Sequence, residues 1–207
     1  MTPKIIKLSD GIEAHLYARW IGDPDAAMAE AERLAWSDEV VTMYGRPCTV
    51  LRKTVGYGLD YGYNVTSKAS IPWEPLPLRI KERLEQEFGI EWQQCACNLY
   101  ISEGAYIGPH HDKYAVIEGE RREPIYVASI SLGVERTMVM IPPGVPLRSV
   151  PTTVTGLLNV PGAVRIDLPS GSLLIFSNSL NRTWKHSIPK GHKGSGGKRI
   201  SLTYRHF

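Results

Sequence analysis

The spacing of apolar residues changes partway along the chain, and this change is the first guide to the fold. Before residue 90, two segments carry the signals of helices. One begins after Asp23, which can cap a helix, with Pro24 at the first helical position, and we expect it to end near Trp36. The other covers residues 78–88, where apolar residues recur every four positions and Gly89 can end the helix.

Beyond residue 90 the period of the pattern becomes two, which is the period of a β-strand. The expected strands cover residues 92–101, 125–132, 137–141, 164–168, 172–176 and 199–205. This order predicts an α+β, mainly β protein in which residues 91–207 form a β-sandwich or jelly-roll core. Residues 1–90 form an N-terminal α/β extension with two helices, and the two parts make one compact unit.

Composition narrows the functional classes only a little. The chain has 207 residues, of which 43% are hydrophobic and 22% charged, as in soluble globular proteins. A formal net charge of +3 permits a nucleic-acid partner without requiring one. No apolar run is as long as a membrane span, and the first residues lack the apolar core of a signal peptide. We therefore expect no membrane association and a cytoplasmic location, or a nuclear one in a eukaryote.

The three cysteines favour a reducing compartment, because an odd number does not suit a disulfide framework. Cys95 and Cys97 have no second pair at the spacing of a zinc knuckle. We interpret them as small buried residues on one face of a strand.

The segment Gly108-Pro109-His110-His111-Asp112 contains a histidine and an aspartate two residues apart. On a strand such side chains point the same way, so His110 and Asp112 can bind one ion while His111 points elsewhere. The best candidate for a third ligand is the distant His186. Two histidines and one carboxylate form the metal site of non-haem Fe(II) oxygenases. The same histidines and aspartate, with His111, would also suit zinc in a hydrolase or a structural site.

A second set of residues favours iron over zinc. Two expected strands alternate strictly and each has a polar face, formed by Arg199, Ser201, Thr203 and Arg205 in one and by Gln94, Ala96, Asn98 and Tyr100 in the other. If both faces line one interior, they create a pocket with two guanidinium groups, which requires an anionic partner with about two carboxylates. A dicarboxylate beside such an iron site is 2-oxoglutarate, and a zinc hydrolase has no need of that pocket.

These motifs together resemble the AlkB family of 2-oxoglutarate-dependent nucleic-acid dealkylases, over residues 46–207. The matching segments, in the family's order, are residues 98–104, 107–112, 129–133, 171–176, 184–189 and 199–205. The resemblance implies a double-stranded β-helix and oxidative demethylation of N-alkylated nucleobases. The reaction uses Fe(II), 2-oxoglutarate and O2, and it releases formaldehyde, succinate and CO2.

The resemblance also implies a role for individual residues. His110, Asp112 and His186 would hold the iron. Asn98 and Arg205 would face the C1 carboxylate of 2-oxoglutarate, the end that chelates iron, and the distal C5 carboxylate would meet Tyr100, Arg199 and Ser201. Ser201 departs from the commoner asparagine, although its hydroxyl can still donate one hydrogen bond.

Substrate recognition is expected in the first ninety residues. Aromatic, glycine and basic residues interleave over residues 51–63, and the equivalent stretch of AlkB proteins is a lid that holds a flipped base. The expected contacts to single-stranded or locally opened DNA or RNA are Arg52, Tyr57, Tyr61 and Tyr63. A tyrosine-rich hairpin packed on the core would have the same composition. Tyr114 is a further candidate contact, at a position where several repair members carry an acidic residue.

Other interpretations remain open on the sequence. A 2-oxoglutarate-dependent hydroxylase of a nucleoside, small metabolite or protein side chain would keep the metal and co-substrate residues and differ in residues 46–75. We interpret the basic, glycine-rich residues 190–198 as a connector, with a phosphate contact as a secondary role. We expect a monomer.

Overall fold

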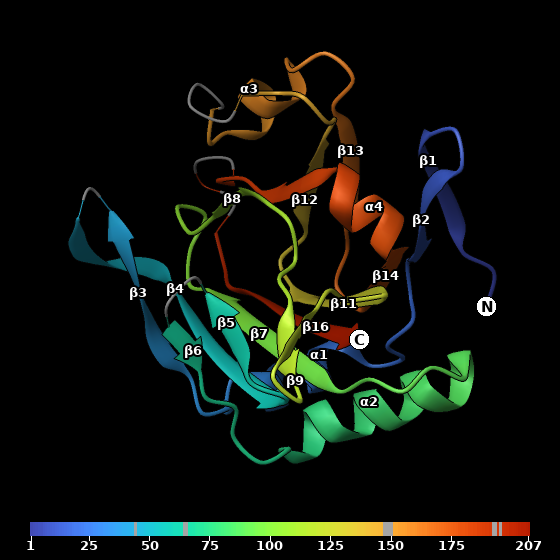
Figure 1. Cartoon of the computed structure of the whole chain (residues 1–207), viewed down its shortest axis with the longest axis vertical. Coiled ribbons are helices and arrows are strands. Elements are labelled where there is room, and N and C mark those ends of the chain that lie inside the picture. The colour runs from blue at the N-terminus through green and yellow to red at the C-terminus, as the bar shows by residue number, and fades with distance from the viewer. Residues whose placement is uncertain (44, 64–65, 147–150, 192–193, 195) are drawn as a thin grey trace.

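The computed structural model describes residues 1–43, 45–63, 66–146, 151–191, 194 and 196–207. Two antiparallel sheets form its centre (Figure 1). The larger sheet consists, in spatial order, of β1 (Lys4–Ser9), β2 (Ile12–Tyr17), β14 (Ser172–Ser177), β11 (Tyr126–Gly133), β16 (Arg199–His206), β7 (Gln94–Tyr100), β4 (Arg46–Gly58) and β3 (Ser37–Met43). The smaller consists of β13 (Val164–Leu168), β12 (Arg136–Ile141), β15 (Lys185–Ile188) and β8 (Ile107–His110).

The chain passes back and forth between these sheets from residue 94 onward. It runs through β7 in the larger sheet, β8 in the smaller, β11 in the larger, then β12 and β13, β14, β15 and finally β16. This winding is a double-stranded β-helix, so the expected jelly roll is confirmed. Apolar side chains from both sheets, among them Val127, Met140 and Leu174, form a buried cluster between them. Each contributes about 1.5–3 kcal/mol by leaving water.

A third sheet joins two segments that are distant in sequence. Its order is β10 (Glu120–Arg122), β9 (Ala115–Ile117), β5 (Tyr61–Tyr63) and β6 (Thr66–Lys68). Tyr61 of β5 pairs with Ala115 of β9, so the chain that follows β4 lies beside the chain that follows β8.

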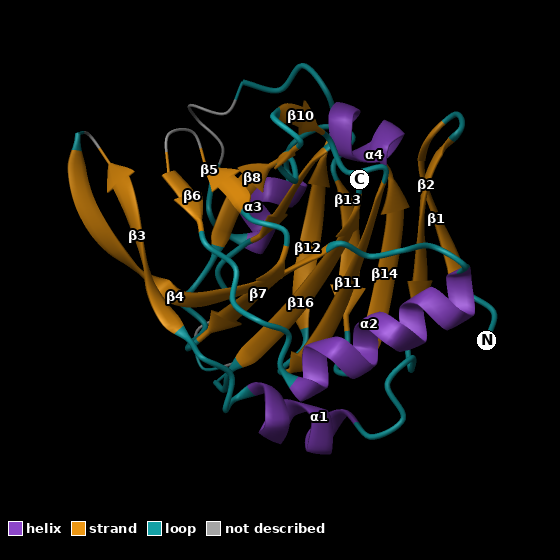
Figure 2. Ribbon diagram, turned by 60° about the horizontal axis from the view of Figure 1, so that its bottom comes forward, coloured by secondary structure: helices purple, strands orange, loops and turns teal. Residues whose placement is uncertain are grey.

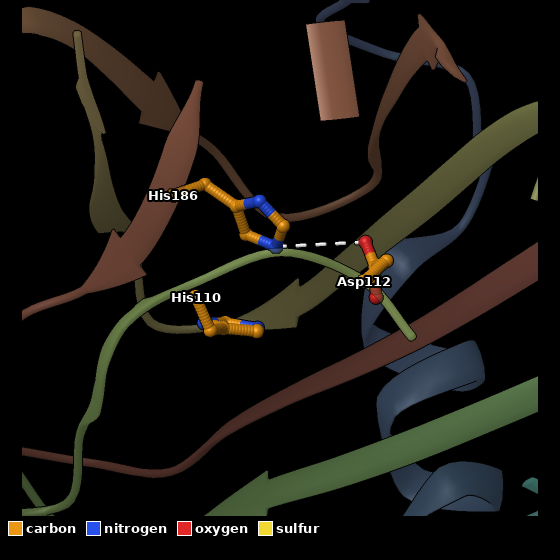
Figure 3. A group of neighbouring side chains, drawn as sticks. All are labelled: His110, Asp112 and His186. Carbon is orange, nitrogen blue, oxygen red and sulfur yellow. Dashed lines mark ion pairs between the residues drawn. The ribbon is translucent and has the colours of Figure 1, made fainter. Parts of the chain in front are cut away.

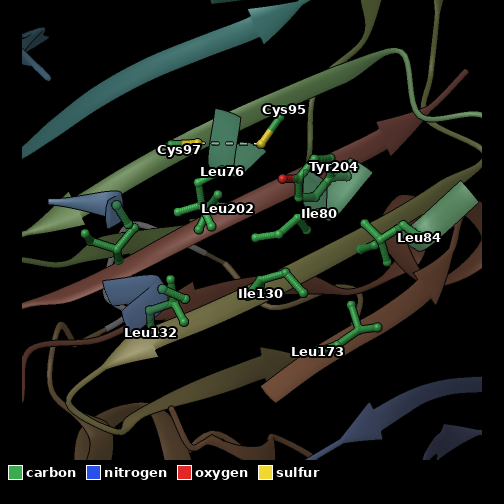
Figure 4. Packing of buried hydrophobic residues seen from close by; sticks show 14 of the residues in the cluster. Leu76, Ile80, Leu84, Cys95, Cys97, Ile130, Leu132, Leu173, Leu202 and Tyr204 are labelled. Atoms are coloured by element: carbon green, nitrogen blue, oxygen red, sulfur yellow. Dashed lines mark hydrogen bonds between the residues drawn. The ribbon is translucent and has the colours of Figure 1, made fainter. Parts of the chain in front are cut away.

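Two helices cover the outer face of the larger sheet (Figure 2). They are α1 (Pro24–Ala31) and α2 (Pro75–Phe88). Ile80 and Leu84 of α2 belong to the same buried cluster as Ile130, Leu173 and Leu202 of the sheet (Figure 4). Because strand side chains alternate, the residues between these apolar ones point away from the helices, toward the smaller sheet.

The helix signals in the sequence were only partly accurate. Asp23 caps α1 as predicted, accepting a hydrogen bond from the Ala26 amide at 3.0 Å. The predicted end near Trp36 is wrong, because α1 stops at Ala31. The Trp36 indole donates to the Ala31 carbonyl at 3.0 Å, and the chain then enters β3 at Ser37.

The second helix begins earlier than predicted and ends where predicted. It starts at Pro75 instead of residue 78, and Gly89 ends it in the left-handed conformation with φ of 65°. The pattern also did not predict α3 (Val154–Leu158) or α4 (Asn178–Thr183). Within the described residues, none of the helices has both the length and the apolar character that crossing a membrane requires.

The six expected strands are confirmed to within a few residues as β7, β11, β12, β13, β14 and β16. The pattern missed the strands before residue 90, and β1 to β4 belong to the same sheet as β7 and β16. In β4 the alternation is hidden because the strand carries the buried Arg52 and includes Gly56 and Gly58, which have no side chains. Cys95 and Cys97 are buried in the core beneath α2, as expected, with their sulfur atoms 3.5 Å apart (Figure 4).

We predict that Gly58→Ala destabilises the fold far more than Gly11→Ala. Both glycines have positive φ, +80° and +69°, which costs an alanine about 1–2 kcal/mol. At Gly58 the added Cβ would also lie 2.1 Å from the Gln93 carbonyl oxygen, whereas described residues leave Gly11 open space to 4 Å. Denaturant unfolding should show a loss about 2 kcal/mol larger for Gly58→Ala. Equal losses of unfolding free energy in the two variants would mean that the contact with the Gln93 carbonyl oxygen is not what disfavours alanine at position 58.

Candidate active site

Three side chains able to bind a metal ion meet between the two sheets (Figure 3). His110 is the last residue of β8, Asp112 follows that strand, and His186 lies on β15. The antiparallel pairing of β15 with β8 sets His186 opposite His110, with ring centroids 4.3 Å apart. Asp112 Oδ2 is 3.5 Å from His186 Nε2. One potential ligand atom from each residue lies within 4.8 Å of the others.

The ionisation of this group suits a cation. Burial lowers the pKa of His110 to about 3 and also lowers that of His186, so both imidazoles are neutral. Burial alone would raise the pKa of Asp112, but Arg205, His186 and His110 together hold it below its ordinary value. Among the described residues, the buried Asp112 Oδ2 makes no hydrogen bond. Two neutral nitrogens and one anionic oxygen are the donor set of a non-haem Fe(II) site.

Asn181 fixes Asp112 through the backbone, and sequence reasoning did not identify it. The Asn181 side chain accepts a hydrogen bond from the Asp112 amide at 2.8 Å and donates to its carbonyl at 3.1 Å. Asn181 is on α4, the short helix between β14 and β15, and is buried. Its position between an apolar strand and the third histidine is the only signal in the sequence.

The two histidines of the H-H-D segment are held differently. His110 donates from Nδ1 to the Gly108 carbonyl at 2.8 Å, which leaves Nε2 for the metal group. His111 hydrogen-bonds through Nδ1 to the Asn181 carbonyl instead. His111 also lines the cavity, but it is not part of the three-residue group found among the described residues.

Arg205 neutralises the carboxylate of the metal group. Its Nε donates to Asp112 Oδ1 at 3.1 Å, Nη2 forms an ion pair with the same oxygen, and Nη1 donates to Gln94 Oε1 at 2.7 Å. These contacts hold one Asp112 oxygen against the arginine and leave the other directed at the histidines. Arg205 therefore lies at the metal end of the cavity.

Arg199 lies on β16, as Arg205 does, and points to the same face of that strand. Its side chain is buried, with 1% of the residue exposed. Nη2 donates to Ser131 Oγ at 2.9 Å, and the guanidinium lies 5.0 Å from the centre of the Tyr100 ring. Burial lowers the pKa of Arg199, while the nearby Tyr100 phenol opposes the change. Its Nε and Nη1 make no hydrogen bond with the described residues. A buried guanidinium with two such donors fits a carboxylate.

The residues expected to bind the co-substrate form rows across neighbouring strands. Arg199 of β16 pairs with Tyr100 of β7, and Ser201 pairs with Asn98. Directly paired residues share a face of the sheet, so these side chains face one cavity. The cavity is lined by Asn98, Tyr100, Arg199, Ser201, Arg205, His110, Asp112 and His186, together with apolar residues of both sheets.

The residues expected to bind substrate are divided between the two faces of β4. Arg52 lines the cavity, is buried, forms an ion pair with Glu39 and donates to the Tyr106 carbonyl at 2.9 Å. Tyr57 points to the opposite face, because it is an odd number of residues from Arg52. It is fully buried beneath α2, donates to Glu74 Oε1 at 2.8 Å and is not brought to the cavity.

The other expected substrate contacts lie around the third sheet. Tyr61 and Tyr63 are on β5, and their side chains lie outside what the structure describes. Tyr114 precedes β9, and the Arg121 guanidinium lies 4.6 Å from the centre of its ring. Tyr114 is not among the residues that line the cavity. Within the basic segment 190–198, residues 192, 193 and 195 lie outside the described part of the chain.

Comparison with known proteins agrees with this geometry. Residues 24–205 match the family model of the 2OG-Fe(II) oxygenase superfamily. Human alpha-ketoglutarate-dependent dioxygenase alkB homolog 3 is 31% identical over 156 residues, covering 74% of this chain and 51% of that protein. The human DNA oxidative demethylase ALKBH2 is 29% identical over 168 residues, covering 80% of this chain and 60% of that protein. The predicted AlkB resemblance is confirmed, and the chain spans about half the length of AlkB homolog 3.

Solved structures share the fold at low sequence identity. OsALKBH1 superposes with a TM-score of 0.55 at 17% identity, over 99% of this chain and 100% of that one. HygX from Streptomyces hygroscopicus, solved with nickel and 2-oxoglutarate bound, has a TM-score of 0.59 at 11% identity, over 95% and 84% of the two chains.

We predict that His186→Ala loses metal affinity and that His111→Ala keeps most of it. The first variant removes a ligand atom of the three-residue group, while the second removes a ring held by a backbone carbonyl. Titration with Fe(II) under anaerobic conditions should show a loss of about a hundredfold or more for His186→Ala, and less than about tenfold for His111→Ala. Equal losses would mean that His111 is a ligand.

Proposed function

Because the chain belongs to the 2OG-Fe(II) oxygenase superfamily, we propose that it is an Fe(II)- and 2-oxoglutarate-dependent dioxygenase that demethylates N-alkylated nucleobases in DNA or RNA. The products would be formaldehyde, succinate and CO2. One observation carries the proposal: in an AlkB-like chain, the metal group faces the same cavity as a buried arginine, two donors of which lack partners among the described residues.

Fe(II) would be held by His110, Asp112 and His186. Bound there with 2-oxoglutarate and O2, it would supply the oxidant that hydroxylates an N-methyl group, and the hydroxymethyl group would then leave the base nitrogen as formaldehyde. The protein's own contribution is to position the reactants. Asn181 and Arg205 fix the carboxylate that would face the iron.

The two arginines of β16 would hold opposite ends of 2-oxoglutarate. Arg205 already contacts Asp112, so with Asn98 it would meet the C1 carboxylate that chelates iron. Arg199, Tyr100 and Ser201 would receive the distal C5 carboxylate, because the Arg199 donors that lack partners among the described residues require an anion.

The nucleic-acid part of the proposal rests on the relatives and on the polar lining of the cavity. The ALKBH2 relatives are named DNA oxidative demethylases, and the chain has a positive net charge. Arg52 adds a guanidinium to the cavity wall on the side of β4, away from the β16 arginines. A base extruded from a strand would meet hydrogen-bonding groups there.

A second candidate is hydroxylation of a nucleoside, small metabolite or protein side chain by the same iron site. It is favoured by the position of Tyr57, which packs in the core and so removes one aromatic ring from the expected base-holding segment.

We predict that Arg199→Ala raises the KM for 2-oxoglutarate by about tenfold or more while metal affinity is retained. A charge-assisted hydrogen bond contributes about 1.5–3 kcal/mol, which gives that factor. Arg205→Ala should weaken both 2-oxoglutarate and Fe(II) binding, because it also removes the partner of Asp112. Arg79→Ala, which breaks an exposed ion pair with Glu30, is the control. An unchanged KM in both variants would mean that the arginines of β16 do not bind the co-substrate.

We predict formaldehyde release from 1-methyladenine or 3-methylcytosine in a short single strand, with one succinate formed per formaldehyde. The panel should include methylated RNA and DNA strands, free methylated nucleosides and unmodified strands, with His186→Ala as the inactive control. If every strand yields succinate without formaldehyde, the assignment as a dioxygenase stands and the proposed nucleic-acid substrate is wrong. Turnover of free nucleosides alone would favour the second candidate.

A further inference from the structure

The buried ion pair between Arg52 and Glu39 extends a row of polar residues across the larger sheet. The row begins with Arg199 of β16 and continues through its partner Tyr100 of β7 to Arg52 of β4, which pairs with Tyr100 on the other side. On β3, the next strand, Glu39 meets Arg52 in an ion pair. Both residues are 7% exposed, and both line the cavity that contains the metal group.

The inward direction of Glu39 coincides with an irregularity of the sheet. Asp38 pairs with Lys53 and Val40 with Thr49, so the register of β3 against β4 shifts at the residue between them. Asp38 and Val40 are exposed, while Glu39 is buried. Register shifts of this kind redirect a side chain and are common beside active sites.

Glu39 and Asp112 are the carboxylates among the described residues that line this cavity. Asp112 belongs to the metal group and is already held by Arg205. Glu39 is therefore the carboxylate through which the cavity wall can interact with a substrate.

The pair does not suit the co-substrate. Glu39 would repel a dianion, and it neutralises the charge of Arg52. Arg199 and Arg205 already supply the two positive charges that a dicarboxylate needs. Glu39 and Arg52 line the same cavity as His110, so a group held by the pair lies in the cavity that contains the metal group. The buried Arg52 Nε makes no hydrogen bond with the described residues.

We propose that Glu39 and Arg52 form the part of the site that recognises the substrate base, and that their opposite charges let it accept both cationic and neutral N-methylated bases. This inference rests on the proposed function. Glu39 accepts from an amino group and attracts a positively charged ring, while Arg52 donates to a ring carbonyl and opposes the positive charge. Neither base charge is strongly preferred while both residues are present.

The two residues therefore act on selectivity in opposite directions. With Glu39→Gln, Arg52 remains as an uncompensated positive charge and disfavours a cationic base. With Arg52→Gln, Glu39 remains as a negative charge and favours one. Charges on buried side chains interact strongly, so we expect each change in selectivity to reach about tenfold.

The test compares two oligonucleotides of the same sequence, one with 3-methylcytosine, which is cationic, and one with 3-methylthymine, which is neutral. The ratio of their kcat/KM values, measured on one preparation, is independent of the fraction of folded enzyme. Relative to wild type, Glu39→Gln should lower the cationic-to-neutral ratio about tenfold and Arg52→Gln should raise it about tenfold. The double variant Glu39→Gln with Arg52→Gln should return the ratio to the wild-type value.

The controls are Glu30→Gln and Arg79→Gln, which break the exposed ion pair between α1 and α2 and should leave the ratio unchanged. The KM for 2-oxoglutarate should change in none of these variants. If wild type oxidises both bases and neither cavity variant changes the ratio, or both change it in the same direction, the inference is wrong and the proposed function stands. An increase in the 2-oxoglutarate KM without a change in ratio would assign the pair to the co-substrate. If wild type forms succinate but oxidises neither of these bases, this inference fails, and the proposed function fails with it only if no methylated strand of the earlier panel releases formaldehyde.

Discussion

The contact between Arg205 and Asp112 is the interaction on which the rest of the site depends. Asp112 is buried, and a buried carboxylate stays ionised only when positive charges and hydrogen bonds compensate for lost hydration. Arg205 provides that charge from the opposite sheet and Asn181 holds the backbone on either side, so the carboxylate has one orientation. Removing one partner of such a pair typically costs about 3–5 kcal/mol. The link also joins the end of β8 to β16, which carries the arginines of the cavity.

One face of the larger sheet packs in the hydrophobic core, and the other face lines the polar cavity. Leu202 and Tyr204 of β16 are packed in the core under α2, while Ser201 and Arg205, which alternate with them, line the cavity. The helices therefore do more than complete the core: by covering one face they fix which residues point toward the smaller sheet. Shifting the register of one strand by a single residue would exchange the two faces, so core packing and site geometry are specified together.

The sequence predicted the features that depend on short-range periodicity. The alternation in β16 and β7 is strict, so the shared polar face was visible before the structure, and so were the three residues of the metal group. Asp112 lies just past the end of β8, so its place beside His110 depends on Asn181 and Arg205 as well as on strand geometry. Features set by tertiary contacts were not predictable. The strand β4 was not predicted, so the opposite directions of Tyr57 and Arg52 along it were missed, and the ion pair of Glu39 with Arg52 depends on the packing of β3 beside β4.

The hydrogen-bond donors of Arg199 make the stability of the folded protein depend on the concentration of a carboxylate ligand. A carboxylate that meets these donors binds the folded chain, because the strands that assemble the cavity are separated in the unfolded chain. Such a ligand lowers the free energy of the folded state by an amount that grows with the logarithm of its concentration. If co-substrate and metal both bind at the network of Asp112 and Arg205, as proposed, each must alter the affinity of the other by the same factor. The amount of folded enzyme in a cell would then follow the supply of iron and of a central metabolite.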